Sequence, residues 1–265
     1  MSVLEALLLG IVQGLTEFLP VSSSGHLVMG QALLGIRLPG VLFEVAVHLA
    51  TLCAVLWVYR SRVSELARGV LRGRRDEWRY VALLALASVP AGVVGVLGRE
   101  WFESAFDRPV LAAGFLVVTG FLVYSIRYTG PRASEPEPGP GQSVWIGLAQ
   151  ALAILPGISR SGATVAAGTW RGVDSVAVAE FSFLLSIPAI LGAGLLQIGD
   201  VVGGGGGPGG PALAAGFVAA LVAGVIAIRW FVRMLEARSF HRFAWYCWIA
   251  GGAYLLAAAV SPGLR

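Results

Sequence analysis

The sequence GIVQGLTEFLPVSSSGH, residues 10–26, recurs in altered form as GLAQALAILPGISRSGA, residues 147–163. The two stretches align at a constant offset without a gap. Two unrelated Ser/Gly turns are the alternative, but gapless matching of glycine, glutamine and serine together is uncommon in apolar sequence. We therefore predict an internal repeat. Its matched polar and glycine positions are Gly10 with Gly147, Gln13 with Gln150, Ser22 with Ser159, Ser24 with Ser161 and Gly25 with Gly162.

The composition of the whole chain is that of a membrane protein. Of its 265 residues, 57% are hydrophobic and 13% are charged, and the mean hydropathy is +0.78. A soluble domain carries about twice that charged fraction. The two cysteines, Cys53 and Cys247, lie far apart in apolar runs, which excludes a disulfide scaffold. The basic residues, all arginine, lie in short loops, so no nucleic-acid partner is expected.

Six apolar stretches are long enough to cross a hydrocarbon layer of roughly 30 Å. They are residues 41–59, 78–98, 110–126, 176–198, 211–230 and 243–260. Two further apolar segments, 3–36 and 144–168, are interrupted near the middle by proline, serine and glycine. Non-helical backbone survives at membrane depth only where protein or a wet cavity surrounds it. We therefore expect each of these two segments to be a re-entrant, broken helix.

The distribution of arginine predicts the orientation. Loops 60–79 and 229–242 are rich in arginine, loop 99–108 has more acids than arginines, and loop 200–210 has no arginine. Arginine-rich loops stay cytoplasmic, so the first two loops are expected inside and the C-terminus outside. The linker 127–143, rich in proline, glycine and glutamate, then lies inside as well.

The predicted fold class is an all-α polytopic membrane protein built as an inverted-topology repeat. The first repeat covers residues 1–126 and the second covers 144–265, and each has one re-entrant segment followed by three transmembrane helices. Because three is an odd number, the second repeat enters the membrane from the opposite side. In such an architecture the broken segments meet near the bilayer midplane and form the site.

The first broken segment places an acid beside hydroxyl groups. Gln13 and Glu17 are four residues apart and share a helix face. An intramembrane carboxylate is expensive, so its presence indicates function. Pro20 ends the helix, and Ser22–Ser24 and His26 follow. At least one serine is expected to cap the returning helix. A buried structural histidine is the alternative for His26, but its place beside Glu17 favours a chemical role.

The second broken segment supplies an arginine. Arg160 stands between Ser159 and Ser161, deep in an apolar half of the chain. Its planar fork of donors suits phosphate oxygens. Gly162 and Thr164 follow, and the hydroxyls and backbone N–H groups at this helix start would extend an anion cradle. A structural ion pair between Arg160 and Glu17 is the alternative, and it also brings the two segments together.

Together these residues are a workable set for hydrolysing a phosphoanhydride. Arg160 would neutralise charge on the transferred phosphoryl group. Glu17, helped by Gln13, could hold a divalent cation, Mg²⁺ or Ca²⁺, that bridges the diphosphate oxygens. His26 could act as a base or proton shuttle. The attacking atom stays open between water and one of the hydroxyls of Ser22–Ser24.

These motifs resemble those of a known family. Residues 13–26, QGLTEFLPVSSSGH, look like the first signature of the undecaprenyl-diphosphate phosphatase family of the bacitracin-resistance type. Residues 156–164, PGISRSGAT, resemble its second signature, and residues 181–188, FSFLLSIP, are similar to a further family stretch. The resemblance covers essentially the whole chain.

The resemblance implies a multi-pass enzyme of the bacterial plasma membrane, with its active site open to the outer side. Its reaction would convert undecaprenyl diphosphate to the monophosphate, with the help of a divalent metal, and so recycle the lipid carrier for cell-wall synthesis and give bacitracin resistance. The positions that match the family's working residues are Glu17, His26, Ser23 and Arg160. Family members have Glu or Gln at position 13, and the amide of Gln13 cannot serve as a base.

Other interpretations stay open. A lipid-phosphate flippase or secondary transporter could use the same midplane site, since inverted repeats are typical of carriers. A homo-oligomer is possible on this sequence. Glu44 and His48, four residues apart within a span, are expected to satisfy each other. Glu180, near Glu44 in the repeat alignment, could face the same cavity.

Overall fold

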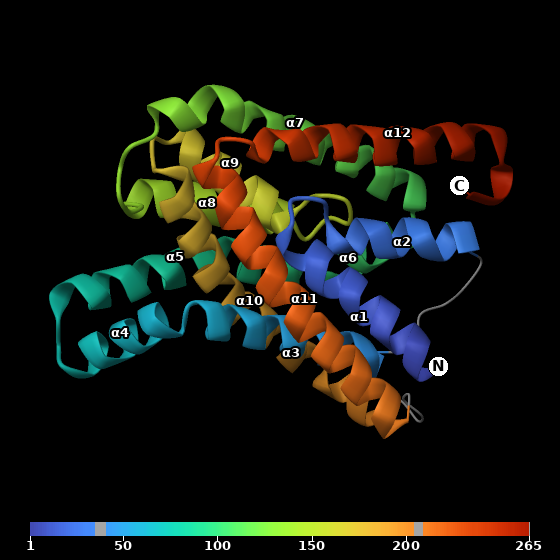
Figure 1. Ribbon diagram of the computed structural model, residues 1–265, viewed down its shortest axis with the longest axis horizontal. Coiled ribbons are helices and arrows are strands. Elements are labelled where there is room, and N and C mark those ends of the chain that lie inside the picture. Colours follow the sequence, from blue (N-terminus) through green and yellow to red (C-terminus); the bar gives the residue numbers. More distant parts are fainter. Residues whose placement is uncertain (35–40, 204–208, 265) are drawn as a thin grey trace.

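The computed structural model describes residues 1–34, 41–203 and 209–264, and in this part of the chain the regular elements are helices (Figure 1). The all-α class is thereby confirmed. A single isolated bridge joins Glu135 and Val173. The α-helices are α1 (Val3–Phe18), α2 (Ser23–Leu34), α3 (Val41–Val58), α4 (Arg60–Leu71), α5 (Arg75–Leu97), α6 (Arg99–Phe106), α7 (Pro109–Thr129), α8 (Pro140–Leu152), α9 (Arg160–Trp170), α10 (Ser175–Gly203), α11 (Gly210–Glu236) and α12 (Phe243–Val260).

Five of these helices are long and apolar enough to cross a membrane, within the described residues: α5, α7, α10, α11 and α12. A sixth candidate span passes the same test only when α3 and α4 are counted together, and these two helices meet at 77°. The chain is therefore a multi-pass membrane protein. Gly35 and Ile36, the last residues of the first predicted broken segment, lie outside the described residues, as do residues 204–208 of the glycine-rich loop.

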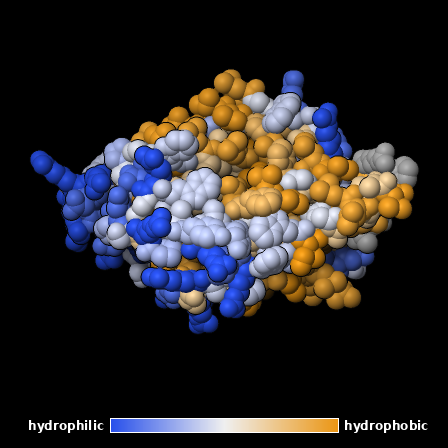
Figure 2. All heavy atoms as spheres, turned by 90° about the horizontal axis from the view of Figure 1, so that it is seen from above, coloured by the Kyte–Doolittle hydropathy of each residue, from blue (hydrophilic) through white to orange (hydrophobic). Residues whose placement is uncertain are grey.

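Hydrophilic residues gather at one end of the molecule, and apolar side chains cover most of the rest of the face in view (Figure 2). The hydrophilic end is the one that carries α4 and the turn into α5 in Figure 1. This turn belongs to the arginine-rich loop 60–79, whose Arg74 pairs with the buried Glu77 at 2.7 Å. A polar end next to an apolar body is the surface that a bilayer requires.

The helix ends follow local sequence signals. Ser2 caps α1 in a capping box with Glu5, whose carboxylate accepts from the Ser2 N–H at 2.8 Å. At the other end, α1 stops two residues before Pro20, since proline cannot continue the hydrogen-bond ladder. Ser159 caps α9 by accepting from the Gly162 N–H at 3.2 Å. These signals place a break in each of the two predicted segments.

The two broken segments touch at their tips, as the sequence predicts. In Figure 1 the α1–α2 turn and the α8–α9 turn lie together near the centre, and their helices run towards opposite ends of the long axis. Ser22 Oγ accepts hydrogen bonds from the N–H groups of Gly157, at 3.1 Å, and Gly25, at 3.3 Å. Thr119 of α7 donates to the Gly157 carbonyl at 2.7 Å. One serine hydroxyl therefore joins both turns.

Aligned glycines allow equivalent close approaches in the two halves. α1 packs along α11, and a Cβ on Gly14 would overlap the backbone of Ala220. α8 packs along α5, and a Cβ on Gly147 would lie 2.5 Å from the carbonyl oxygen of Ala87. Small residues let backbones approach closely where lipid gives no hydrophobic force between helices. Each long arm of a broken segment thus lies against a span of the other half.

The structure corrects the expectation for Glu180. Its carboxylate does not face the cavity between the tips, because Arg62 of α4 binds it at 3.1 Å. The same guanidinium binds Glu65 at 3.1 Å and Glu137 at 3.0 Å, and it lies 4.7 Å from the ring centroid of Tyr80. Arg62 therefore connects Glu180 of α10 to Glu137 of the linker between the two halves, at the arginine-rich end.

Candidate active site

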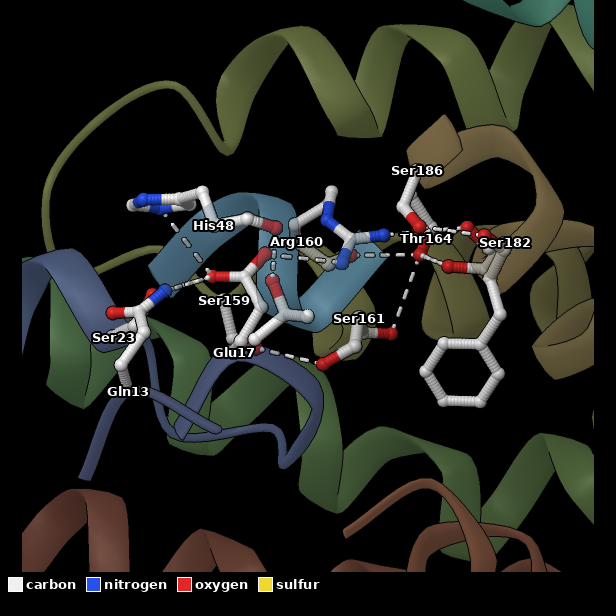
Figure 3. Close-up of polar contacts among 12 residues, drawn as sticks. Gln13, Glu17, Ser23, His48, Ser159, Arg160, Ser161, Thr164, Ser182 and Ser186 are labelled. Atoms are coloured by element: carbon white, nitrogen blue, oxygen red, sulfur yellow. Dashed lines mark hydrogen bonds and ion pairs between the residues drawn. The ribbon is translucent and has the colours of Figure 1, made fainter. Parts of the chain in front are cut away.

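Glu17 is the centre of the polar network where the two tips meet (Figure 3). It lies in the last turn of α1, and its side chain is only 10% exposed. One carboxylate oxygen, Oε2, accepts from Gln13 Nε2 at 3.1 Å and from Ser23 Oγ at 3.0 Å. The other, Oε1, faces Arg160 Nη2 at 3.3 Å. The predicted pairing of Gln13 with Glu17 on one helix face is confirmed.

Arg160 is the first residue of α9, and its side chain reaches the Glu17 carboxylate. Its guanidinium lies between Glu17 and α10, where Nη1 donates to the backbone carbonyl of Ser182 at 3.3 Å (Figure 3). Thr164 Oγ1 donates to the Arg160 carbonyl and lies 2.7 Å from Ser182 Oγ. Neighbouring residues therefore hold both the guanidinium and the backbone carbonyl of Arg160. The contact with Glu17 uses one of its five N–H donors and the contact with Ser182 another.

A cavity of about 300 Å³ opens beside this pair. Of the site residues predicted from the sequence, those that line it are Glu17, Ser22, Ser23, Ser24, Ser159 and Arg160. The remaining wall comes from α3, from α6, from the α8–α9 turn and from α10, and it includes apolar side chains such as Leu49, Phe106 and Ile190. Three hydroxyls of one tip and the guanidinium of the other thus face a common space.

The other predicted binding residues lie behind this cavity. Thr164 and Ser161 are buried, and each is engaged by a neighbour: Ser161 Oγ lies 3.2 Å from Ser159 Oγ. Gly162 gives its backbone N–H to the capping serine, Ser159. Gln13 is also buried and reaches the site only through Glu17. These residues fix the tips and do not contact the cavity.

His26 lies outside the cavity, against α12. Its ring is stacked on Tyr246, with centroids 5.6 Å apart. Nδ1–H donates to the Ser22 carbonyl at 2.8 Å, since a carbonyl can only accept, and Nε2 lies 2.7 Å from the Tyr246 hydroxyl. The sequence places His26 after the break, and the chain has turned away from Glu17 by that point. This arrangement holds the Ser22 carbonyl at a turn where Ser22 has a positive φ of 63°.

A different histidine faces the carboxylate. His48 of α3 lines the cavity, and its Nε2 lies 3.9 Å from Glu17 Oε2. Its Nδ1–H donates to the backbone carbonyl of Glu44 at 2.7 Å. His48 is therefore bonded to Glu44 through the backbone carbonyl and also faces Glu17. Sequence spacing relates His48 only to its own helix, and the contact with Glu17 follows from the packing of α3 beside α1.

The arrangement suits chemistry on an anionic group. A hydroxyl that donates to a buried carboxylate is the geometry of a nucleophile next to its base. A guanidinium at the edge of the same cavity supplies charge to stabilise an anion. Groups of three or more His, Cys, Asp or Glu able to hold a metal ion are not found among the described residues.

The chain is thus a multi-pass helical membrane protein in which a carboxylate, a guanidinium and serine hydroxyls meet between two broken helices. The chain belongs to the bacitracin resistance protein BacA family, whose model matches residues 6–253.

Curated relatives match over nearly their full length. A protein of Desulfatibacillum aliphaticivorans is 39% identical and covers 96% of this chain and 98% of its own. Relatives from Methanobrevibacter smithii and Rubrobacter xylanophilus are 41% and 42% identical and cover 95% and 93% of this chain, and 96% and 94% of their own. All three are named undecaprenyl-diphosphatase. The comparison agrees with the family that the two signatures predict.

Proposed function

We propose that this protein hydrolyses undecaprenyl diphosphate to undecaprenyl phosphate and inorganic phosphate. The observation that carries the proposal is the Glu17–Arg160 contact at 3.3 Å, made between two separate tips beside a cavity lined with serine hydroxyls. The family match and the name shared by the relatives support the same reaction. Its product would return the lipid carrier to cell-wall synthesis, and removal of the diphosphate would account for resistance to bacitracin.

In the proposed reaction, Ser23 Oγ attacks the terminal phosphorus and gives its proton to Glu17 Oε2, which already accepts its hydrogen bond. The P–O bond to the bridging oxygen breaks, and undecaprenyl phosphate leaves. Glu17 passes this first proton to the departing phosphate oxygen. It can then take a proton from the water that attacks the phosphoserine, and it returns that proton to Ser23 Oγ as the bond from Ser23 to phosphorus breaks and inorganic phosphate is released. Arg160 binds phosphoryl oxygens throughout and stabilises their charge.

A divalent cation, Mg²⁺ or Ca²⁺, fits this site only if the substrate provides most of its oxygen ligands. The protein donor would be the Glu17 carboxylate, which Gln13 Nε2 holds at 3.1 Å from behind the cavity. Mg²⁺ is often bound in this way, through one or two carboxylates and substrate phosphates. When bound, the cation would neutralise charge on the diphosphate oxygens. The separation of Glu17 from other acids supports a shared cation rather than a permanent one.

We further propose that the protein lies in the bacterial plasma membrane as an inverted repeat, with the cavity open to the outer side. One observation supports this orientation, and a second supports the inverted repeat. The arginine-rich end carries α4, and the cavity wall comes from α6 and from parts of α3 and α10 that lie away from that end. The opposite directions of the two broken segments in Figure 1 support the inverted arrangement.

The proposal is tested by phosphate release from undecaprenyl diphosphate in detergent, where no second compartment exists. We expect the wild-type protein to release phosphate, and Arg160→Ala to lower kcat/KM by about 10²- to 10³-fold. Arg160→Lys should also be severe, because a point charge loses the planar fork. The matched control is Arg171→Ala, at the far end of α9, where the guanidinium lies over Trp145.

Two results would contradict the proposal. Wild-type turnover by both Arg160 variants would remove the guanidinium from the reaction. Absence of phosphate release by a folded wild-type protein, together with transport of undecaprenyl phosphate across vesicle membranes, would favour the flippase.

A further inference from the structure

A second, larger cavity continues from the candidate active site. It is a groove of about 680 Å³ between α5 and α10, bordered by the α8–α9 turn and by α6. Phe106, Ile154 and Arg160 line both the groove and the active-site cavity. A molecule in the groove can therefore reach the guanidinium without leaving the protein. The rest of the groove wall is mostly apolar, with side chains such as Val96 and Leu196.

Three glycines keep this groove open. A Cβ on Gly92 or on Gly192 would meet no atom within 4 Å, and one on Gly95 would meet only Ile154 Cδ1, at 3.5 Å. Each of the three lies inside a helix, where glycine is less favourable than alanine. They also differ from Gly14 and Gly147, which another helix contacts closely. Neither a positive φ nor close helix packing accounts for these three glycines, and at each of them a larger side chain would project into open space.

We infer that this groove binds the isoprenoid units next to the diphosphate of the substrate, and that Gly92, Gly95 and Gly192 are specificity-determining residues for the lipid chain. An apolar channel that ends at a guanidinium matches a molecule with a long apolar chain and an anionic head. Its volume lies in the range of pockets that hold small organic ligands, so only the first part of a long chain fits and the remainder lies in lipid. The inference rests on the proposed function for the identity of the head group.

The kinetic test uses variants whose side chains fill the groove. Gly92→Leu and Gly192→Leu place side chains into the open space, and Gly114→Leu is the matched control. Gly114 lies in α7, has no atom within 4 Å of its Cβ position, and lines a separate apolar cavity of about 820 Å³ near Leu255. We expect KM for undecaprenyl diphosphate to rise at least tenfold more than KM for dimethylallyl diphosphate in both groove variants. In Gly114→Leu the two KM values should change by the same factor.

A labelling experiment tests occupancy without turnover. Farnesyl diphosphate with a photoreactive diazirine on its first isoprene unit should label peptides of α5 and α10 in the wild-type protein. Labelling should persist in Ser23→Ala, which keeps Arg160 and the groove. A diazirine phospholipid serves as the comparison, and it should label α5 and α10 less than the isoprenoid probe does.

Several results would overturn the inference. In the kinetic test, these are equal changes of both KM values in the groove variants, or an effect of Gly114→Leu as large as that of the groove variants. In the labelling test, they are isoprenoid label on α7 and α12 instead of α5 and α10, or stronger labelling of α5 and α10 by the phospholipid than by the isoprenoid probe. Absence of hydrolysis by the folded wild-type protein, with isoprenoid label still on α5 and α10, would contradict the proposed reaction and leave the groove assignment standing. Thermal unfolding of each variant in detergent shows that the measured protein is folded.

Discussion

The carboxylate of Glu17 distinguishes the site at the scale of single residues. It accepts from Gln13 and Ser23 and faces Arg160 of the other tip, so it links the two tips through an ion pair. Gln13 contributes only through that carboxylate. We expect Glu17→Gln to lower kcat by roughly 10²-fold or more, since it removes the proton acceptor, and Gln13→Ala to lower it much less. The measurement is phosphate release at saturating substrate, and similar losses in the two variants would mean that the carboxylate has no special role.

His48 provides a second prediction at this scale. Its Nε2 faces Glu17 at 3.9 Å and lines the cavity. We expect His48→Ala to lower kcat by about tenfold, less than the roughly 10²- to 10⁴-fold that acid–base groups contribute, and His48→Gln to recover part of the loss because the amide keeps a polar group beside Glu17. His241→Ala is the matched control, since His241 lies against Tyr124 away from the cavity. Unchanged turnover in His48→Ala would remove the residue from the site.

The sequence predicts some of these residues well and others poorly for physical reasons. Gln13 and Glu17 are one helical turn apart, so their pairing follows from helix geometry. Arg160 is recognisable because an unpaired charge in apolar sequence needs a partner. His48 and the Ser182 carbonyl enter the site through packing of α3 and α10, which no local pattern specifies. His26 is close to Glu17 in sequence, but the turn at Ser22 directs it to Tyr246.

At the scale of helices, glycine pairs fix the two long arms of the broken segments. Gly14 lies against Ala220 of α11, and Gly147 lies against Ala87 of α5. We expect Gly14→Leu and Gly147→Leu each to destabilise the fold by about 1–3 kcal/mol or more through overpacking. Gly252→Leu is the control, since a Cβ there meets no atom within 4 Å. Thermal unfolding in detergent measures the effect, and a loss in only one arm would contradict their equivalence.

Helix boundaries are the part of the fold that the sequence predicts most directly. Pro20 and the capping Ser159 mark the two breaks, and proline opens α7 and α8. Which helices pack together is harder to predict, because most of their surfaces are equally apolar. The contacts of α1 with α11 and of α8 with α5 depend on small residues whose partners are far away in the sequence.

The orientation of the whole molecule can be tested by labelling. α5 has 23 residues and spans about 34 Å, so α4 and α6 lie at opposite ends of it. In a Cys53→Ser background, with Cys247 buried, we expect Ser104→Cys on α6 to react with an impermeant maleimide in intact spheroplasts. Leu71→Cys on α4 should react only after lysis. The reverse pattern would place the arginine-rich end outside and contradict the proposed orientation.

The Glu17–Arg160 contact has a consequence for the order of synthesis. The ribosome delivers the carboxylate with α1, long before the guanidinium at the start of α9. Until then Glu17 enters the bilayer without its counter-ion, and an isolated charge in hydrocarbon is strongly disfavoured. The nascent first tip must therefore stay hydrated while the first three spans insert. The site is complete only after the second tip has been synthesised and has met the first.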